Sequence, residues 1–267
     1  MKPAPFAYED PRELDEVLGL LAREGEDVQV LAGGQSLVPL LNFRLARPDR
    51  LVDINRVEEL SYLRRDGDVL RIGALARHVD LERSEEVISG WPLLAQAVRH
   101  VGHPQIRARG TVCGSVAHAD PAAELPVALL ALDARFHVRS LRGARTLRGE
   151  ELFLGFLTTT LEPDELLVEI EVPAVPAGSG SAFVEHARTH GDFALGGAAA
   201  VVGADGARLA LLGAGPVPMR FDGPVEELPD AAVTGLSLTG DDADWRRALL
   251  RQLAREALDL ASRRAEA

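Results

Sequence analysis

The chain has 267 residues, of which 46% are hydrophobic and 26% charged, a balance that is typical of globular domains. Its formal net charge of -12 argues against nucleic acid or an anionic membrane as the main partner. The single cysteine, Cys113, excludes an internal disulfide and any iron–sulfur or zinc site built from cysteines of this chain. No apolar stretch approaches the roughly 20 residues of a membrane span. The acidic N-terminus lacks the apolar segment of a signal peptide, so we expect a cytoplasmic protein.

The first 55 residues predict a compact α/β unit. Apolar residues recur at helical spacing over residues 11–24, with Asp10 as the expected N-cap and Gly25 as the end of the helix. The elements expected after it are a strand at 28–32, a helix at 36–43 and a strand at 51–54.

The middle of the chain predicts a second α/β unit. Asp66-Gly67 is a strong hairpin signal between two apolar runs. Pro92 is compatible with the first turn of a helix. The expected elements are strands at 62–65, 69–72, 136–140 and 166–172, and helices at 91–101 and from about residue 121.

The last third begins after a proline- and glycine-rich stretch at 172–182, which we interpret as a linker. A second hairpin is expected at the Gly-Ala-Asp-Gly sequence between strands at 198–202 and 208–212. Residues 244–263 predict an amphipathic helix whose apolar face holds Trp245, Leu249, Leu250, Leu253, Leu258 and Leu260.

Two glycine-rich loops are the candidate binding elements. Gly33-Gly34 ends a strand and opens onto a helix, where backbone N–H groups can turn towards an anion. Ser36 can either cap that helix or donate to a phosphate oxygen. A tight turn with an N-cap is the alternative interpretation, because neither nucleotide-binding pattern of the G-x-G-x-x-G or G-x-x-x-x-G-K-[ST] type is present.

The second loop, Gly110-Thr111-Val112-Cys113-Gly114-Ser115, strengthens the binding interpretation. It adds two hydroxyls and also precedes a helix, so two loops could close on a pyrophosphate from both sides. Neither loop has a Lys or Arg between its glycines, which suits a diphosphate that is held rather than cleaved. We therefore expect a pyrophosphate to approach Gly33 and Gly34 too closely for a side chain.

Four segments together resemble the FAD-binding medium subunits of molybdenum hydroxylases, the family of xanthine dehydrogenase and carbon monoxide dehydrogenase. They are "LAGGQSLVPLLNFRLARPDRLVDINRV", "IRARGTVCGSVAHADPAAELPVALLAL", "LEPDELLVEIEVP" and "HGDFAL", in this order along the chain. The resemblance covers the whole chain and implies an α+β fold. It implies an FAD-binding domain of the vanillyl-alcohol oxidase (PCMH) type in two α+β subdomains, residues 1–56 and 57–175. A C-terminal α+β domain, residues 176–267, would contain a three-stranded antiparallel sheet with helices.

The same resemblance implies the cofactor-binding residues. The two loops would wrap the pyrophosphate, while Asp120 and Glu124 would lie near the ribityl or ribose hydroxyls. Leu167 would lie against the flavin, and the segment Asp192-Phe193 near its ring system. The residues implied to bind FAD are Leu31, Ala32, Gly33, Gly34, Gln35, Ser36, Leu37, Thr111, Gly114, Ser115, Asp120, Glu124 and Leu167.

By resemblance, this subunit takes electrons from iron–sulfur clusters and passes them through FAD to NAD or another acceptor. Its partners would be a molybdopterin-containing large subunit and a [2Fe-2S] small subunit, in a hetero-oligomer such as a dimer of heterotrimers. No catalytic side chain is implied, because the flavin carries the redox chemistry.

Two alternatives stay open. The first is a stand-alone FAD-dependent oxidoreductase, which would need a general base. The second is an assembly subunit that has lost FAD, suggested by Ala108, Cys113 and Ser115, where many family members have Asn, Gly and Asn. The pair His186 and His190 has the spacing of a helical metal site but no third ligand, so no metal is expected.

Overall fold

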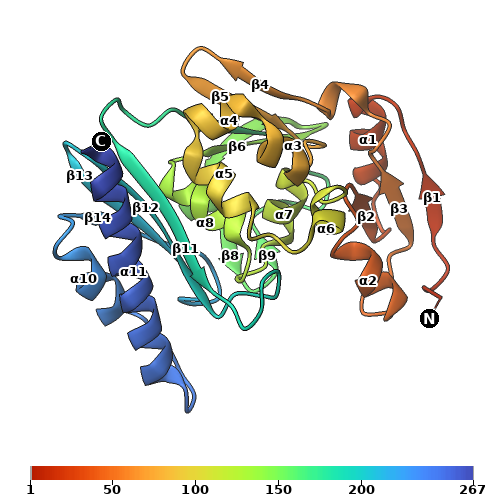
Figure 1. Cartoon of the computed structure of the whole chain (residues 1–267). Coiled ribbons are helices and arrows are strands. Elements are labelled where there is room, and N and C mark those ends of the chain that lie inside the picture. The colour runs from red at the N-terminus through yellow and green to blue at the C-terminus, as the bar shows by residue number, and fades with distance from the viewer. Residues whose placement is uncertain (1, 267) are drawn as a thin grey trace.

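The N-terminal part of the chain forms a small parallel sheet with two helices. In the computed structural model, which describes residues 2–266, the central strand β3 pairs in parallel with both β1 and β2 (Figure 1). Leu31 lies opposite Asp53, so the chain leaves β2 and β3 at the same edge of the sheet. The elements are β1 (Ala7–Glu9), α1 (Leu14–Leu21), β2 (Val28–Leu31), α2 (Leu37–Asn42) and β3 (Arg50–Asp53).

The predicted start and end of the first helix are wrong. Helix α1 begins at Leu14 without a side-chain cap, and the Leu14 amide donates to Glu59 Oε1 at 3.0 Å. Asp10, the expected N-cap, instead pairs with Arg56 at 2.6 Å. The helix ends at Leu21, and Gly25 lies in the turn beyond it with a φ of +78°. The start of this helix is therefore set by contacts with residues about 45 positions away along the chain, and not by the local capping pattern.

The middle part of the chain folds around an antiparallel sheet in the order β4-β5-β10-β6-β7. The hairpin predicted at Asp66-Gly67 is confirmed, with Gly67 at a φ of +61°. Strand β7 has no predicted counterpart, because Leu147 is its only buried side chain. The strands are β4 (Leu63–Asp66), β5 (Val69–Gly73), β6 (Arg135–Ser140), β7 (Gly143–Arg148) and β10 (Leu166–Pro173).

Alternation along β10 separates the two faces of this sheet. Ile170 and Val172 are buried on the face that helices cover, whereas Glu169 and Glu171 lie on the opposite face. The apolar helix expected from residue 121 begins at Glu124, after a turn that Asp120 stabilises through the Ala122 amide. The remaining elements are η1 (Glu58–Leu60), α3 (His78–Arg83), α4 (Glu85–Gly90), α5 (Pro92–Val98), α6 (Pro104–Arg107), α7 (Val112–His118), α8 (Glu124–Ala131), α9 (Gly149–Leu152), β8 (Phe153–Gly155) and β9 (Thr158–Thr159).

The C-terminal part is an antiparallel sheet covered by a long helix. Strands follow the order β11-β12-β13-β14, and α11 lies along β11 and β12 (Figure 1). The other face of this sheet meets α8 of the middle part. The elements are β11 (Gly180–His186), β12 (Gly196–Gly203), β13 (Gly206–Leu212), β14 (Met219–Gly223), α10 (Leu228–Thr234) and α11 (Ala243–Ala265).

Three predictions for this part are wrong. Its sheet has four strands, because β14 adds an edge strand with only partly buried or exposed side chains. The linker is shorter than predicted: β10 continues to Pro173 and β11 starts at Gly180. Trp245 is 50% exposed, because the buried face of α11 starts only at Leu250.

One hydrophobic core runs through all three parts of the chain. It joins Leu18 of α1 and Ile72 of β5 to Ala199 and Leu212 of the C-terminal sheet. A second cluster packs α11 and α10 against the other face of that sheet. The predicted domain boundaries at residues 56 and 175 stay a prediction. Within residues 2–266, no helix is both long and apolar enough to cross a membrane.

Candidate functional site

The first glycine loop connects β2 to α2. Gly34 has a φ of +72°, a left-handed conformation that glycine adopts without strain. Ser36 already has helical dihedral angles, and its hydroxyl makes no capping hydrogen bond to α2. Of the two roles left open for Ser36, capping is therefore wrong, and its hydroxyl remains available on the loop.

The second glycine loop opens α7. Thr111 is the N-cap of this helix: its hydroxyl oxygen accepts from the Gly114 amide at 3.2 Å, and its carbonyl accepts from Ser115 at 3.0 Å. Thr111 keeps its O–H as a donor. The Cys113 thiol is buried against the Ile72 carbonyl at 3.8 Å, and burial raises its pKa, so we expect no reactive thiolate.

The two loops are in direct backbone contact. A β-carbon placed on Gly33 would lie 2.7 Å from both Arg109 O and Gly110 Cα and 2.9 Å from Thr111 N. The expectation that a pyrophosphate excludes a side chain at Gly33 is therefore wrong, because the backbone of the second loop is what excludes it. The glycine lets the two loops close on each other.

His78 holds the second loop in place and was not predicted. Its backbone amide donates to Gly110 O at 3.0 Å, and its ring Nε2 lies 3.0 Å from Thr111 O. A carbonyl only accepts, so Nε2 carries the proton, and Nδ1 is a buried acceptor that has no hydrogen-bond partner among residues 2–266. Burial lowers the pKa of His78 to about 4, so the ring is neutral at pH 7. A lone histidine gives no sequence pattern that would have revealed this role.

The loops lie on one cleft of about 840 Å³. This volume falls in the range of about 300–1,000 Å³ that is usual for small-molecule sites. Leu31 does not line the cleft; its carbonyl accepts from Ile54 and ties β2 to the chain after β3. The other predicted residues all line it: Ala32, Gly33, Gly34, Gln35, Ser36, Leu37, Thr111, Gly114, Ser115, Asp120, Glu124 and Leu167, together with Asp192 and Phe193.

A buried acidic residue, Glu124, lines the cleft, and a second carboxyl group, Glu185, acts on it electrostatically. Burial raises the pKa of Glu124 to about 7, with Glu185 adding to the shift and His100 opposing it. His100 Nδ1 lies 3.0 Å from Glu185 Oε1, which outweighs burial and raises the pKa of His100. The other oxygen, Glu185 Oε2, is buried and has no hydrogen-bond partner in the described part of the chain. Of these two carboxyl groups only Glu124 is among the residues that line the cleft, so Glu124 can offer an acceptor to a hydroxyl group of a ligand.

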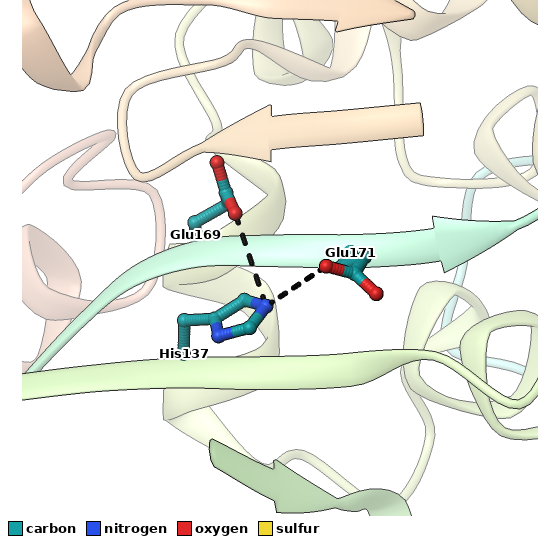
Figure 2. Close-up of side chains that lie close together, drawn as sticks. All are labelled: His137, Glu169 and Glu171. Carbon is teal, nitrogen blue, oxygen red and sulfur yellow. Dashed lines mark hydrogen bonds and ion pairs between the residues drawn. The ribbon is translucent and has the colours of Figure 1, made fainter. Parts of the chain in front are cut away.

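A second group of side chains has the composition of a metal site. Figure 2 shows His137 Nε2 between Glu169 and Glu171, at 3.8 Å and 3.4 Å. However, Arg71 Nη1 already lies 2.7 Å from Glu169 and 3.3 Å from Glu171. Strand register explains the arrangement, because Glu171 is opposite Arg71 and Arg135, and Glu169 is opposite His137. We interpret these residues as cross-strand ion pairs that stabilise the sheet.

The structure separates the two histidines that have the spacing of a helical metal pair. His186 ends β11, and His190 lies in the loop after it, so the two do not share a helix face. The ring of His190 instead lies 6.5 Å from that of His100.

The features of the cleft define a class of site. Arg47 is the sole arginine or lysine among the described residues that line it, and two glycine loops supply hydroxyl and backbone donors. The lining also includes the acidic residues Asp120 and Glu124 and the apolar residues Leu157, Leu161 and Leu167. Such a cleft fits a dinucleotide cofactor that is held in place, with a diphosphate, hydroxyl groups and an apolar ring.

The family follows from comparison with known proteins. The sequence model described as "FAD binding domain in molybdopterin dehydrogenase" matches residues 4–175, so the chain belongs to this family. The 6-hydroxypseudooxynicotine dehydrogenase complex subunit alpha of Paenarthrobacter nicotinovorans is 48% identical over 226 residues, which are 82% of this chain and 76% of that protein. The carbon monoxide dehydrogenase medium chain of Hydrogenophaga pseudoflava is 36% identical and covers 98% of each chain.

A solved structure agrees with the sequence comparison. Carbon monoxide dehydrogenase from Hydrogenophaga pseudoflava has a chain that superimposes with a TM-score of 0.93 at 36% identity, covering 99% of both chains. The protein is therefore an FAD-binding subunit of the molybdenum hydroxylase family and belongs to an oxidoreductase. The predicted cofactor and family are confirmed.

Proposed function

We propose that FAD lies in the cleft with its diphosphate between the two glycine loops. The contact of Gly33 with the second loop is the observation that carries this proposal, because it makes one continuous surface from two distant segments. Backbone N–H groups that open a helix, such as those of Ser36 and Leu37, have no partner in that helix and suit an anion. The hydroxyls of Ser36, Thr111 and Ser115 add donors on the same cleft.

The other parts of FAD, its hydroxyl groups and its flavin ring, would contact the remaining residues that line the cleft. Asp120 and Glu124 would accept hydrogen bonds from ribityl or ribose hydroxyls. Leu167 would pack against the flavin ring, and Phe193 would cover its edge. Phe193 is 71% exposed, a large apolar side chain at the cleft that a ring could partly cover. His78 Nδ1 is a further acceptor at the second loop.

We further propose the role of the chain within a larger enzyme. FAD, when bound, exchanges electrons singly or in pairs. The residues of this chain hold the cofactor, exclude water from its apolar part and fix its orientation. Electrons would come from iron–sulfur clusters of a [2Fe-2S] small subunit, fed by a molybdopterin-containing large subunit, and would leave to NAD or another acceptor. The names "medium chain" and "complex subunit" of the relatives support a hetero-oligomer, such as a dimer of heterotrimers.

The proposed domain layout belongs to the same picture. Residues 1–56 and 57–175 would form the two subdomains of a PCMH-type FAD domain, and residues 176–267 a C-terminal domain. The separate sheets of these three segments support this division, while the shared core supports their close packing.

A stand-alone oxidoreductase is the second candidate, and one observation favours it. Glu124 is a buried carboxyl group in the cleft whose pKa is raised to about 7, as in many general bases. Under this candidate, Glu124→Gln would abolish reduction of the flavin by a small-molecule donor. Under the subunit proposal, the chain alone has no such donor, and the variant changes only FAD affinity.

Anaerobic reduction and reoxidation of the purified chain with FAD test the proposed function. The reduced protein is mixed with NAD⁺, a quinone or oxygen, and the return of flavin absorbance near 450 nm is followed. We expect the flavin absorbance to return rapidly with one of these acceptors. We also expect the flavin to be reduced only when an iron–sulfur partner subunit is added. A protein that takes no flavin contradicts the proposal, as does one whose flavin is reduced directly by a small organic substrate.

A further inference from the structure

The two glycine loops are linked to each other by side chains that lie outside the loops. The loops meet through the backbone at Gly33 and Gly110, where neither has a side chain. The longer side chains of the loops are used locally: Gln35 donates to Gly33 O at 3.1 Å, and Thr111 caps α7. The side-chain hydrogen bonds that link the two loops therefore come from another part of the chain.

Two side chains outside the loops make that connection. Asn55 follows β3, and its Nδ2 donates to Ala32 O of the first loop at 2.8 Å. Arg77 donates through Nη2 to Asn55 Oδ1 and through Nη1 to Arg109 O, just before the second loop. A continuous path of hydrogen bonds thus runs from Ala32 through Asn55 and Arg77 to Arg109. We call this path the loop bridge.

The first end of the loop bridge is fixed by its own neighbours. Asp53 Oδ1 accepts from the Asn55 side chain at 2.6 Å and from the Asn55 amide at 2.9 Å. The second oxygen of Asp53 accepts from Tyr8 at 2.7 Å, which raises the pKa of Tyr8 to about 12. Asn55 is therefore held in one orientation, with Nδ2 as donor and Oδ1 as acceptor.

The second end is fixed through the backbone of Arg77. Its amide donates to Asp80 Oδ2 at 2.8 Å, and Arg77 pairs with Thr111 as an isolated β-bridge. The planar guanidinium then presents two donors at a set angle, which suits two separate acceptors. Burial is the main cause that lowers the pKa of Arg77, yet an arginine keeps its charge at any usual pH. Arg77 does not line the cleft, so it would act on a ligand only through the loops.

We propose that Asn55 and Arg77 are positioning residues, whose loop bridge fixes the spacing of the two glycine loops and thereby sets the affinity for the diphosphate of FAD. This inference rests on the proposed function. If the bridge works as one unit, breaking it at either residue has the same effect, and breaking it at both adds little.

The test is an FAD titration of the full-length chain after removal of flavin, followed by flavin fluorescence. Arg77→Met and Asn55→Ala are each expected to weaken FAD binding about 10- to 100-fold, as for loss of a hydrogen bond to a charged group. The double variant is expected to bind within about twofold of the weaker single variant. Arg56→Met is the control, since Arg56 lies next to Asn55 and pairs with Asp10 at 2.6 Å, away from the loops; wild-type affinity is expected.

Melting temperatures of the FAD-free proteins separate positioning from general destabilisation. The inference would be overturned if the two single losses of FAD affinity summed in the double variant. It would also be overturned if the loss of FAD affinity in each variant ran parallel to the fall in its melting temperature. So would wild-type affinity in either single variant. Arg77→Lys covers the case in which Arg77→Met does not fold: it keeps the charge but not the two-pronged donor, and about fivefold weaker binding is expected. Wild-type affinity for Arg77→Lys would also overturn the inference, because lysine cannot reproduce the two hydrogen bonds of the bridge. A wild-type chain that binds no FAD contradicts the proposed function as well, whereas unchanged variants contradict only the bridge.

Discussion

Replacing Gly33 by alanine tests the contact between the two glycine loops. Gly33 does not have a positive φ, so the substitution adds no backbone strain and acts only through the new β-carbon. That atom would lie 2.7 Å from Arg109 O and Gly110 Cα, and reaching the 3.4 Å of an ordinary contact needs a shift of 0.7 Å (3.4 − 2.7). All its near neighbours are backbone atoms, so a loop must move as a whole. Overpacking of this kind costs about 1–3 kcal/mol.

The expected result is a loss of both stability and FAD affinity. In chains of this size, the melting temperature falls about 2–4 °C for each kcal/mol. A displaced loop no longer presents its donors at the spacing that the diphosphate needs. A loss of binding free energy of the same size, about 1–3 kcal/mol, raises the dissociation constant for FAD about 5- to 150-fold. Thermal unfolding and fluorescence titration measure the two effects.

Gly19→Ala is the matched control for this experiment. Gly19 is an exposed residue of α1 with nothing within 4 Å of a new β-carbon. Alanine in an exposed helix is favoured over glycine by about 0.8–1.0 kcal/mol, so this variant is expected to be slightly more stable, with unchanged FAD affinity. If Gly33→Ala behaved like Gly19→Ala, the loops would not be packed as described, and the reasoning would fail.

Three other variants are expected to behave as follows. Gly34→Val forces a branched side chain into a φ of +72° and should abolish FAD retention, while hydrogen exchange of α11 stays slow; normal flavin content would be inconsistent with the proposed site. Burial raises the pKa of Glu124 from 4.5 to about 7, so the folded chain binds an extra proton between these values and its free energy of unfolding falls as the pH rises through them. Glu124→Gln should flatten that decline in urea unfolding at pH 5 and pH 8; an unaltered decline would assign it to another group. Arg71→Met leaves Glu169 and Glu171 without their shared cation and should cost about 1–3 kcal/mol. Added Zn²⁺ should not stabilise the wild-type protein, and a rise in its melting temperature would favour a metal site instead.

The loops could be recognised from sequence because their signals are local. A short apolar run that ends in glycines before a helix marked Gly33, and a small-residue turn with two hydroxyls before a helix marked Gly110; both are visible within ten residues. The resemblance then supplied the cofactor, which the family comparison confirms. What the local pattern did not reveal is why Gly33 is a glycine, because its neighbour lies on a segment more than 70 positions away.

The remaining parts of the site depend on long-range contacts. His78, Asn55 and Arg77 are ordinary polar residues in the sequence, and only the fold brings them to the loops. The same cause explains the wrong N-cap of the first helix, since Asp10 is taken by Arg56. The edge strand β14 was not predicted either. It has little buried surface, so its sequence does not alternate clearly between apolar and polar residues.

A crystal structure of the full-length chain with FAD tests the proposed binding mode most directly. We expect the diphosphate between residues 32–36 and 111–115, the ribityl or ribose hydroxyls near Asp120 and Glu124, and the flavin ring against Leu167. A diphosphate bound elsewhere on the chain, or loops that separate at Gly33 to admit it, would contradict the proposal.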